Sequence, residues 1–191
     1  MCLKFPKISE TATSLRIEDG VTLSLPTVDF HGPFLAKAGT LDFELPSFAQ
    51  RGGIYLWTVE FEGGYLTNYV GETIRPFPDR FLDHKKWYQS GKDVCDPDLM
   101  AKGENWLLDK PTIEQTIKFF ACYRLFLAPM DSSKEQLLRI ENAIIRRLLI
   151  IGGKCKDFLG NKRTKPLEIV GEKMLIKCES VIHGLGAHLL V

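Results

Sequence analysis

The fold is decided by one stretch of the chain, GIYLWTVEFEGGYLTNYVG at residues 53–71. Residues 54–61 and residues 65–70 are rich in aromatic and β-branched side chains, which is typical of β-strands. Between them, Glu62-Gly63-Gly64 is a turn sequence. The stretch therefore predicts a β-hairpin.

The length of the turn decides where two tyrosines of this hairpin lie. If the turn takes three residues, Trp57 faces Tyr69, and Tyr55 lies on the same face, diagonal to Tyr69. A two-residue turn, Gly63-Gly64, would put the tyrosines on opposite faces, because side chains alternate along a strand. A site that uses both tyrosines together requires the first arrangement.

The segment after the hairpin predicts a helix and a further strand. Pro76 and Pro78 lead into a helix over about residues 79–89. Residues 117–128 are apolar and aromatic enough for a third strand, which Pro129 closes.

The clearest helix covers about residues 133–151. A capping-box pattern at residues 132–135 starts it, and Gly152-Gly153 ends it. We therefore expect an α/β fold of the α+β kind, with a small central antiparallel sheet of about three strands flanked by helices.

The two ends of the chain carry further strand patterns. Residues 21–25 and 40–45 alternate apolar and polar side chains, and residues 174–179 are a plausible strand. Three regions are expected on this basis. They are a β-rich N-terminal extension or lobe (1–50), a central domain (51–165) and a C-terminal extension that packs on the core (166–191).

Length and composition restrict the class of protein. The chain has 191 residues, an average apolar and charged content, no long apolar run and no apolar signal segment. Its five cysteines form no C-x-x-C pair, which argues against a zinc site or a disulfide framework. We expect a cytoplasmic protein with reduced thiols and no membrane contact.

Charge is unevenly distributed, although the net charge is only +1. Residues 139–165 contain eight basic and two acidic side chains, whereas the first sixty residues contain five basic and seven acidic ones. A local basic surface can collect phosphates. A solvated helix face followed by a basic loop explains the same pattern equally well.

Glu141 lies in the apolar stripe of the helix predicted at 133–151. Leu137 and Ile145 lie about 40° to either side of it, and Leu148 lies about 20° away. A carboxylate in this position loses hydration that a partner must replace. A divalent cation is one such partner, and a buried arginine or an opening in the core is another.

Arg80 and His84 are one helical turn apart and share a face of the helix predicted at 79–89. Arginine can hold a phosphate oxygen with a fork of donors, and histidine can move a proton near neutral pH. Taken alone, the pair is better explained by a surface helix in which Arg80 pairs with Asp83 and the histidine is solvated.

Residues 53–161 resemble the GIY-YIG nuclease family. The motif of that family consists of G-I-Y, a spacer, Y-[IV]-G, a downstream arginine and a metal-binding glutamate on a later helix. The residues at these places are Gly53-Ile54-Tyr55, Tyr69-Val70-Gly71, Arg80 and Glu141. His84 resembles a histidine of restriction-enzyme and homing-endonuclease members. Glu72 stands where several members carry lysine, and Arg75 is a second candidate for the arginine.

The resemblance implies an endonuclease that hydrolyses phosphodiester bonds in DNA with one Mg²⁺ or Mn²⁺ ion. It implies that Glu141 binds the metal and that Arg80 stabilises charge on the phosphate. Tyr55, Tyr69 and His84 would handle the proton of the attacking water. The residues expected to contact phosphate are Arg80, Lys85, Lys154, Lys156, Asn161, Lys162 and Arg163.

The expected partner is DNA, either duplex or branched. One such site cuts one strand, so a double-strand cutter would be a homodimer or would nick twice. The alternative is a non-catalytic nucleic-acid-binding module on the same scaffold. A third reading is an interaction domain whose motif matches are accidental.

Overall fold

The computed structural model of the protein describes residues 14–16, 22–24, 27–161, 175–178, 180–185 and 188–190. These residues form a mixed fold of helices and strands, as predicted. The main sheet has, in spatial order, the strands β5 (Gly64–Thr73), β4 (Gly53–Phe61), β6 (Tyr123–Pro129), β3 (Thr27–Leu35), β7 (Leu175–Cys178) and β8 (His188–Leu190). A separate pair joins β1 (Ser14–Arg16) to β2 (Thr22–Ser24), which confirms a strand near residues 21–25.

The prediction of a sheet of about three strands is wrong, because strands from both ends of the chain extend it. β3 pairs antiparallel with β6 and parallel with β7, and β7 pairs antiparallel with β8. β3 escaped prediction because Gly32-Pro33 resembles a turn. In the structure the strand continues past these residues with a shift in register between His31 and Phe34. β7 confirms the strand expected near residues 174–179.

Residues 40–45 do not form the predicted strand. Within the described part of this segment, pairing is limited to a single bridge between Ala36 and Phe43. Phe43 is buried, and its ring lies against those of Trp57 and Phe120. The alternating pattern of residues 40–45 therefore reflects one side chain anchored in the core. The division of the chain at residues 50 and 165 stays a prediction.

The hairpin of β4 and β5 is closed by two residues. Glu62 and Gly63 both have positive φ angles, of 44° and 75°, as a tight hairpin turn requires. The predicted three-residue turn is therefore wrong. A register shift between Trp57 and Thr58 leaves Asn68 as an extra residue in β5, so that Trp57 still pairs with Tyr69.

The two long helices lie close to where the sequence predicts them. α1 (Phe77–Gln89) begins two residues before the prediction, with Pro78 in its first turn. α4 (Lys134–Ile151) is confirmed and ends at Gly152, but its capping box is formed by Ser133 and Gln136, one residue later than predicted. Four shorter helices are η1 (Ser47–Gln50), α2 (Pro97–Met100), α3 (Ile113–Ala121) and α5 (Gly153–Phe158).

The prediction of a single strand over residues 117–128 is only half right. Its first part belongs to α3, where Thr112 and Gln115 form a reciprocal capping box. β6 begins after this helix, at Tyr123. Local capping at residue 112 thus overrides the strand preference of the aromatic side chains that follow.

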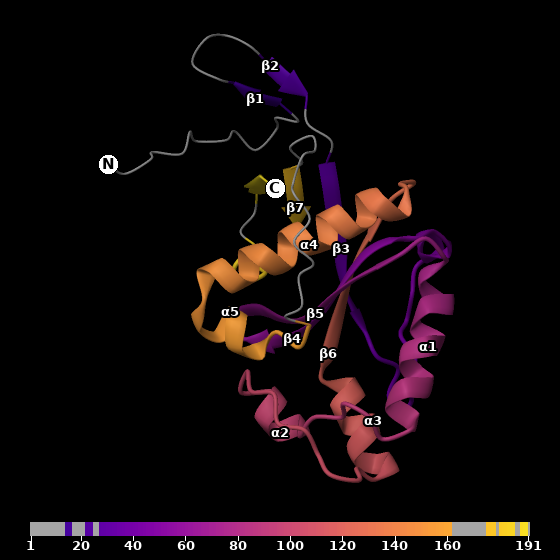
Figure 1. Ribbon diagram of the computed structural model, residues 1–191. Coiled ribbons are helices and arrows are strands. Elements are labelled where there is room, and N and C mark those ends of the chain that lie inside the picture. The colour runs from indigo at the N-terminus through magenta and orange to yellow at the C-terminus, as the bar shows by residue number, and fades with distance from the viewer. Residues whose placement is uncertain are drawn as a thin grey trace.

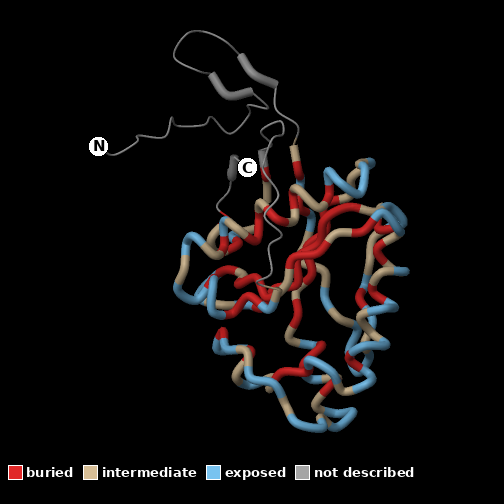
Figure 2. The backbone as a smooth tube through the Cα atoms, viewed as in Figure 1, coloured by how far each residue is buried: buried red, intermediate tan, exposed pale blue. Residues whose placement is uncertain are grey.

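The sheet has helices on both sides. α1 and α4 lie on opposite sides of the strands (Figure 1). Tyr55 and Trp57 of β4 point toward α1, where both rings contact Phe81. α4 packs against β5 and β4. Buried residues run along β4, β5 and β6 (Figure 2), so the core passes through the hairpin that carries the two tyrosines.

Candidate active site

Tyr55 lies in the middle of β4 and has no exposed surface. It pairs across the hairpin with Gly71, and a Cβ atom at residue 71 would overlap the Tyr55 ring. Because residue 71 is a glycine and has no side chain, the ring of Tyr55 can lie against its backbone. Tyr69 stacks on Tyr55, with ring centroids 6.1 Å apart and planes inclined by 20°. The prediction that both tyrosines share one face is confirmed.

Two side chains of α1 meet the phenol oxygen of Tyr55. Nε of Arg80 donates a hydrogen bond to it, at 3.0 Å. Nε2 of His84 lies 2.9 Å from the same oxygen. Since a guanidinium group can only donate, the hydrogen of the phenol is free to be donated to His84. The one-turn spacing of Arg80 and His84 thus places both residues on Tyr55.

Burial shifts the pKa values of this group. Burial, and to a smaller extent the positive charge of Arg80, lower the pKa of His84 to about 4. His84 is therefore neutral at neutral pH, and its Nε2 atom can accept a hydrogen. Burial also raises the pKa of Tyr55 well above its ordinary value, while Arg80 acts against this rise. Tyr55 therefore keeps its proton at neutral pH unless a nearby positive charge stabilises the phenolate.

The structure distinguishes Arg80 from Arg75. Arg75 forms an ion pair with Asp83 at the surface. Nη1 of Arg80 also comes within 3.8 Å of Asp83, but its Nε atom is committed to Tyr55. Arg80 is thus the arginine that lies beside the tyrosines. Arg75, in contrast, forms a surface ion pair with Asp83.

Glu141 occupies the expected place on α4. Leu137, Ile145 and Leu148 around it are buried, and Glu141 itself is half-buried. Burial, and to a smaller extent the negative charge of Glu72, raise the pKa of its carboxyl to about 7. The part of the chain that the structure describes provides no hydrogen bond or ion pair to this carboxylate. Its charge also contributes to the raised pKa of Tyr69, which is caused mainly by burial.

Sequence reasoning missed the roles of two residues near Glu141. Glu72, at the end of β5, forms an ion pair with Lys134 in the first turn of α4. Its other oxygen, Oε2, is buried and has no hydrogen-bond partner among the described residues. One available signal was the seven-residue spacing of Lys134 and Glu141, which puts both on one side of the helix.

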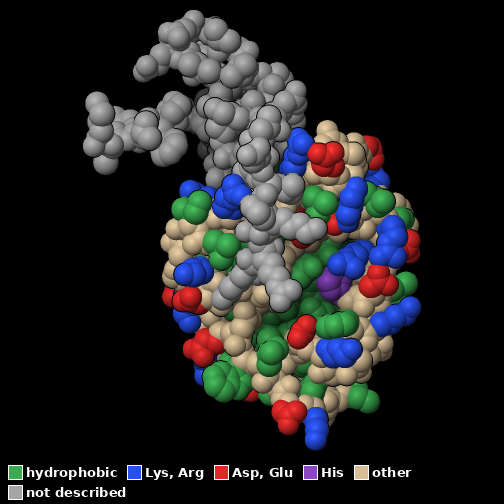
Figure 3. All heavy atoms as spheres, viewed as in Figure 1, with side chains coloured by type: hydrophobic (Ala, Val, Ile, Leu, Met, Phe, Trp, Pro, Cys, Tyr) green, Lys and Arg blue, Asp and Glu red, His purple; other side chains and the backbone are tan. Residues whose placement is uncertain are grey.

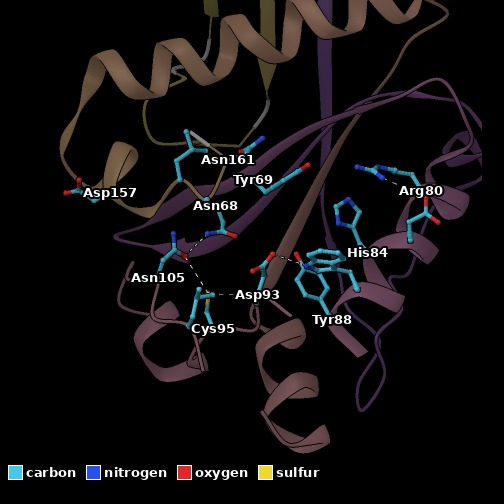
Figure 4. A pocket seen from close by; sticks show the side chains of 15 residues that line it. Asn68, Tyr69, Arg80, His84, Tyr88, Asp93, Cys95, Asn105, Asp157 and Asn161 are labelled. Carbon is cyan, nitrogen blue, oxygen red and sulfur yellow. Dashed lines mark hydrogen bonds and ion pairs between the residues drawn. The ribbon is translucent and has the colours of Figure 1, made fainter. Parts of the chain in front are cut away.

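Tyr69 opens onto a cleft of about 770 Å³. Tyr69, Arg80 and His84 line one end of it, as the close view shows (Figure 4). The space-filling view shows hydrophobic side chains in this hollow, with a histidine among basic and acidic groups at its edge (Figure 3). Trp87 is half exposed at the rim and donates a hydrogen bond to Asp93.

Asn161 lies at the cleft and is held by the backbone. Its Oδ1 atom accepts a hydrogen bond from the amide of Val70, and its Nδ2 atom donates to the Val70 carbonyl. The side chain therefore pairs with the edge strand between Tyr69 and Gly71. Close by, Asn68 donates to the carbonyl of Phe158. Together the two amides attach the end of α5 and the residues after it to β5.

The predicted phosphate-binding lysines lie in different places. Lys85 forms an ion pair with Asp42, at 2.8 Å, beside a separate cavity. Lys154 approaches the carbonyls of Lys102 and Gly103, and Lys156 is exposed. Lys162 and Arg163 lie outside the described residues. Phosphate binding by these side chains stays a prediction.

Comparison of the chain with protein families, with curated proteins and with solved structures finds no match. The described residues contain no group of three or more His, Cys, Asp or Glu side chains that could hold a metal ion. Across the same residues, every helix is too short or too polar to cross a membrane.

Proposed function

We propose that the protein is a metal-dependent endonuclease that hydrolyses phosphodiester bonds in DNA at a single GIY-YIG-type site. The observation that carries this proposal is the double contact of the Tyr55 oxygen with Arg80 and His84. A phenol that only packs in a core needs one hydrogen-bond partner. A cation on one side of the oxygen and a neutral imidazole on the other are the partners of a phenol that transfers a proton.

Tyr55 takes the proton of the attacking water in this proposal. As that proton reaches the phenol oxygen, the phenol's own hydrogen passes to Nε2 of His84, so a free phenolate need not form. Arg80 stabilises negative charge on the oxygen while the two protons move. A phosphate in the cleft would raise the pKa of His84 and make it a better acceptor.

Arg80 has a second role toward the substrate. Its Nε atom is engaged with Tyr55 and its Nη1 atom lies 3.8 Å from Asp83, so a terminal nitrogen can still donate to a non-bridging phosphate oxygen. The same side chain lines the cleft in which a strand would lie. Arg80 would then hold the phosphate within reach of the tyrosine that activates the water.

Glu141 is the residue proposed to hold Mg²⁺ or Mn²⁺. A half-buried carboxylate with a raised pKa and no ion pair from the described residues suits a divalent cation, which prefers oxygen ligands. Such an ion, when bound, polarises the phosphate and stabilises the leaving oxygen.

Nicking of a supercoiled plasmid tests the proposal. We expect nicked circles with Mg²⁺ and none with a chelator. Glu141→Gln should slow nicking about 100-fold or more, because transition-state charge loses its stabilisation. Tyr55→Phe should slow it by about 10²–10⁴-fold, because the proton acceptor is lost. Glu135→Gln is the matched control, since Glu135 is exposed on the same helix and pairs with Arg139.

Undiminished nicking by Glu141→Gln would remove the metal role of this residue. Plasmid binding that weakens with salt, without nicking under any metal, would instead favour the non-catalytic binding module. Because one site cuts one strand, linear product would point to a homodimer or to successive nicks. A cytoplasmic location and a DNA substrate belong to the same proposal.

A further inference from the structure

Glu72 is a buried acid with one unused oxygen. Its side chain is 10% exposed, and its Oε1 atom is ion-paired with Lys134, whose own side chain is 53% exposed. The Oε2 atom is buried, and no group among the described residues donates a hydrogen bond to it. Burying such an oxygen without a partner costs free energy, so an ion or a water is expected to complete it.

Glu72 and Glu141 lie on the same side of the sheet. Glu72 pairs with Ile54 and follows Gly71, so its side chain points away from Tyr55 and toward α4. On α4, Lys134 and Glu141 are two turns apart on one side of the helix. The contact of Lys134 with Glu72 places that side of α4 over the end of β5.

Arg80 lies between the tyrosines and the end of β5 that carries Glu72. Arg80, Glu72 and Lys134 line a small cavity of about 180 Å³, and Arg80 also lines the large cleft with His84 and Tyr69. A phosphate bound to Arg80 would therefore lie between the Tyr55–His84 pair and Glu72. A cation bound at Glu72 could contact the same phosphate.

We propose that Glu72 is a second carboxylate ligand of the divalent cation that Glu141 binds, and that Lys134 takes the cation's place on Glu72 when the cation is absent. The inference rests on the proposed function. Mg²⁺ and Mn²⁺ are commonly bound by one or two carboxylates, with water and substrate phosphate completing the shell. Lys134 can move aside because half of its side chain is already in solvent.

Manganese binding without DNA tests the inference. Free Mn²⁺ gives a six-line electron paramagnetic resonance signal that decreases on binding, so no nuclease activity is needed. Glu72→Gln should weaken binding at least roughly tenfold, as should Glu141→Gln. Lys134→Gln should strengthen it about two- to fivefold, because a competing cation is removed. Glu135→Gln removes an exposed charge from the same turn of α4 and should leave binding unchanged.

Binding by Glu72→Gln equal to that of the wild type would overturn the proposal, as would a wild type that binds no Mn²⁺. Weaker binding by Lys134→Gln would overturn the competing role of the lysine. Melting in chelator, compared across the variants, confirms that each one is folded. Intact manganese binding without plasmid nicking would count against the nuclease and leave the two-carboxylate site standing.

Discussion

His84 and Glu141 have pKa values shifted in opposite directions by the same cause. Burial disfavours the charged form of each group, which lowers the pKa of the imidazole and raises that of the carboxyl. His84 is held neutral, as a proton acceptor requires. In the proposed function, a divalent cation would stabilise the charged form of Glu141. Neither shift is visible in the sequence, although the position of Glu141 in an apolar stripe indicates the direction of one.

These shifts predict opposite effects of pH on stability. The pKa of His84 is about 4 in the folded state and about 6.5 when unfolded, so its contribution stabilises the protein above pH 6.5 and is lost toward pH 4. The pKa of Glu141 is about 7 when folded, so stability falls as pH rises from about 4.5 to 7. Each contribution is on the order of 3 kcal/mol, and the two partly cancel.

Single variants separate the two contributions in urea unfolding without divalent cations. Glu141→Gln should gain stability relative to the wild type as pH rises from about 4.5 to 7. His84→Gln should lose stability relative to the wild type as pH rises from about 4 to 6.5. Parallel pH profiles for the wild type and both variants would show that neither group is perturbed by folding.

The hairpin of β4 and β5 shows how two errors of sequence reasoning cancel. The turn takes two residues, which alone would put Tyr55 and Tyr69 on opposite faces. The extra residue Asn68 moves the register back by one, so Trp57 and Tyr69 still pair. Asn68 is also fully used, since it accepts a hydrogen bond from Tyr123 and donates to Asn105 and Phe158.

We predict that Asn68→Ala lowers the free energy of unfolding by about 2–3 kcal/mol, because buried partners lose their hydrogen bonds. Asn105→Ala, at a more exposed amide of the same network, should cost about 1 kcal/mol. Hydrogen exchange at the Val70 amide should accelerate in Asn68→Ala, since the segment from Phe158 to Asn161 loses one of its hydrogen bonds to β5. A smaller loss for Asn68→Ala than for Asn105→Ala would contradict this account.

The whole sheet depends on strands that are distant in sequence. β3 comes from the first fifty residues and lies between β6 and β7, with Val28 and Phe30 buried in the common core. The site hairpin therefore unfolds together with β3 if the sheet is one cooperative unit. A separate N-terminal lobe would instead unfold independently of the hairpin.

Phe30→Ala should destabilise the entire fold by about 3–5 kcal/mol, because it leaves a cavity in the core. Asp29→Ala changes an exposed neighbour in the same strand and should cost less than about 0.5 kcal/mol. Urea unfolding followed by circular dichroism and by tryptophan fluorescence should give one coincident transition. Two separate transitions, with only one affected by Phe30→Ala, would support an independent lobe.

The sequence by itself determined the elements that local chemistry controls. The hairpin follows from its composition, α4 from its cap and apolar stripe, and Arg80 and His84 from one helical turn. The resemblance to the GIY-YIG motif then indicated Tyr55, Tyr69 and Glu141 as candidate site residues. These signals are readable because each depends on neighbours within a few residues.

Only the tertiary structure decided which segments that are distant in sequence contact one another. It alone showed β3 and β7 in the sheet, the ring of Tyr55 in the space at Gly71, and Lys134 on Glu72. The physical reason is that such contacts depend on sheet order and burial, which no local pattern records. The pKa values of the site follow from the same burial.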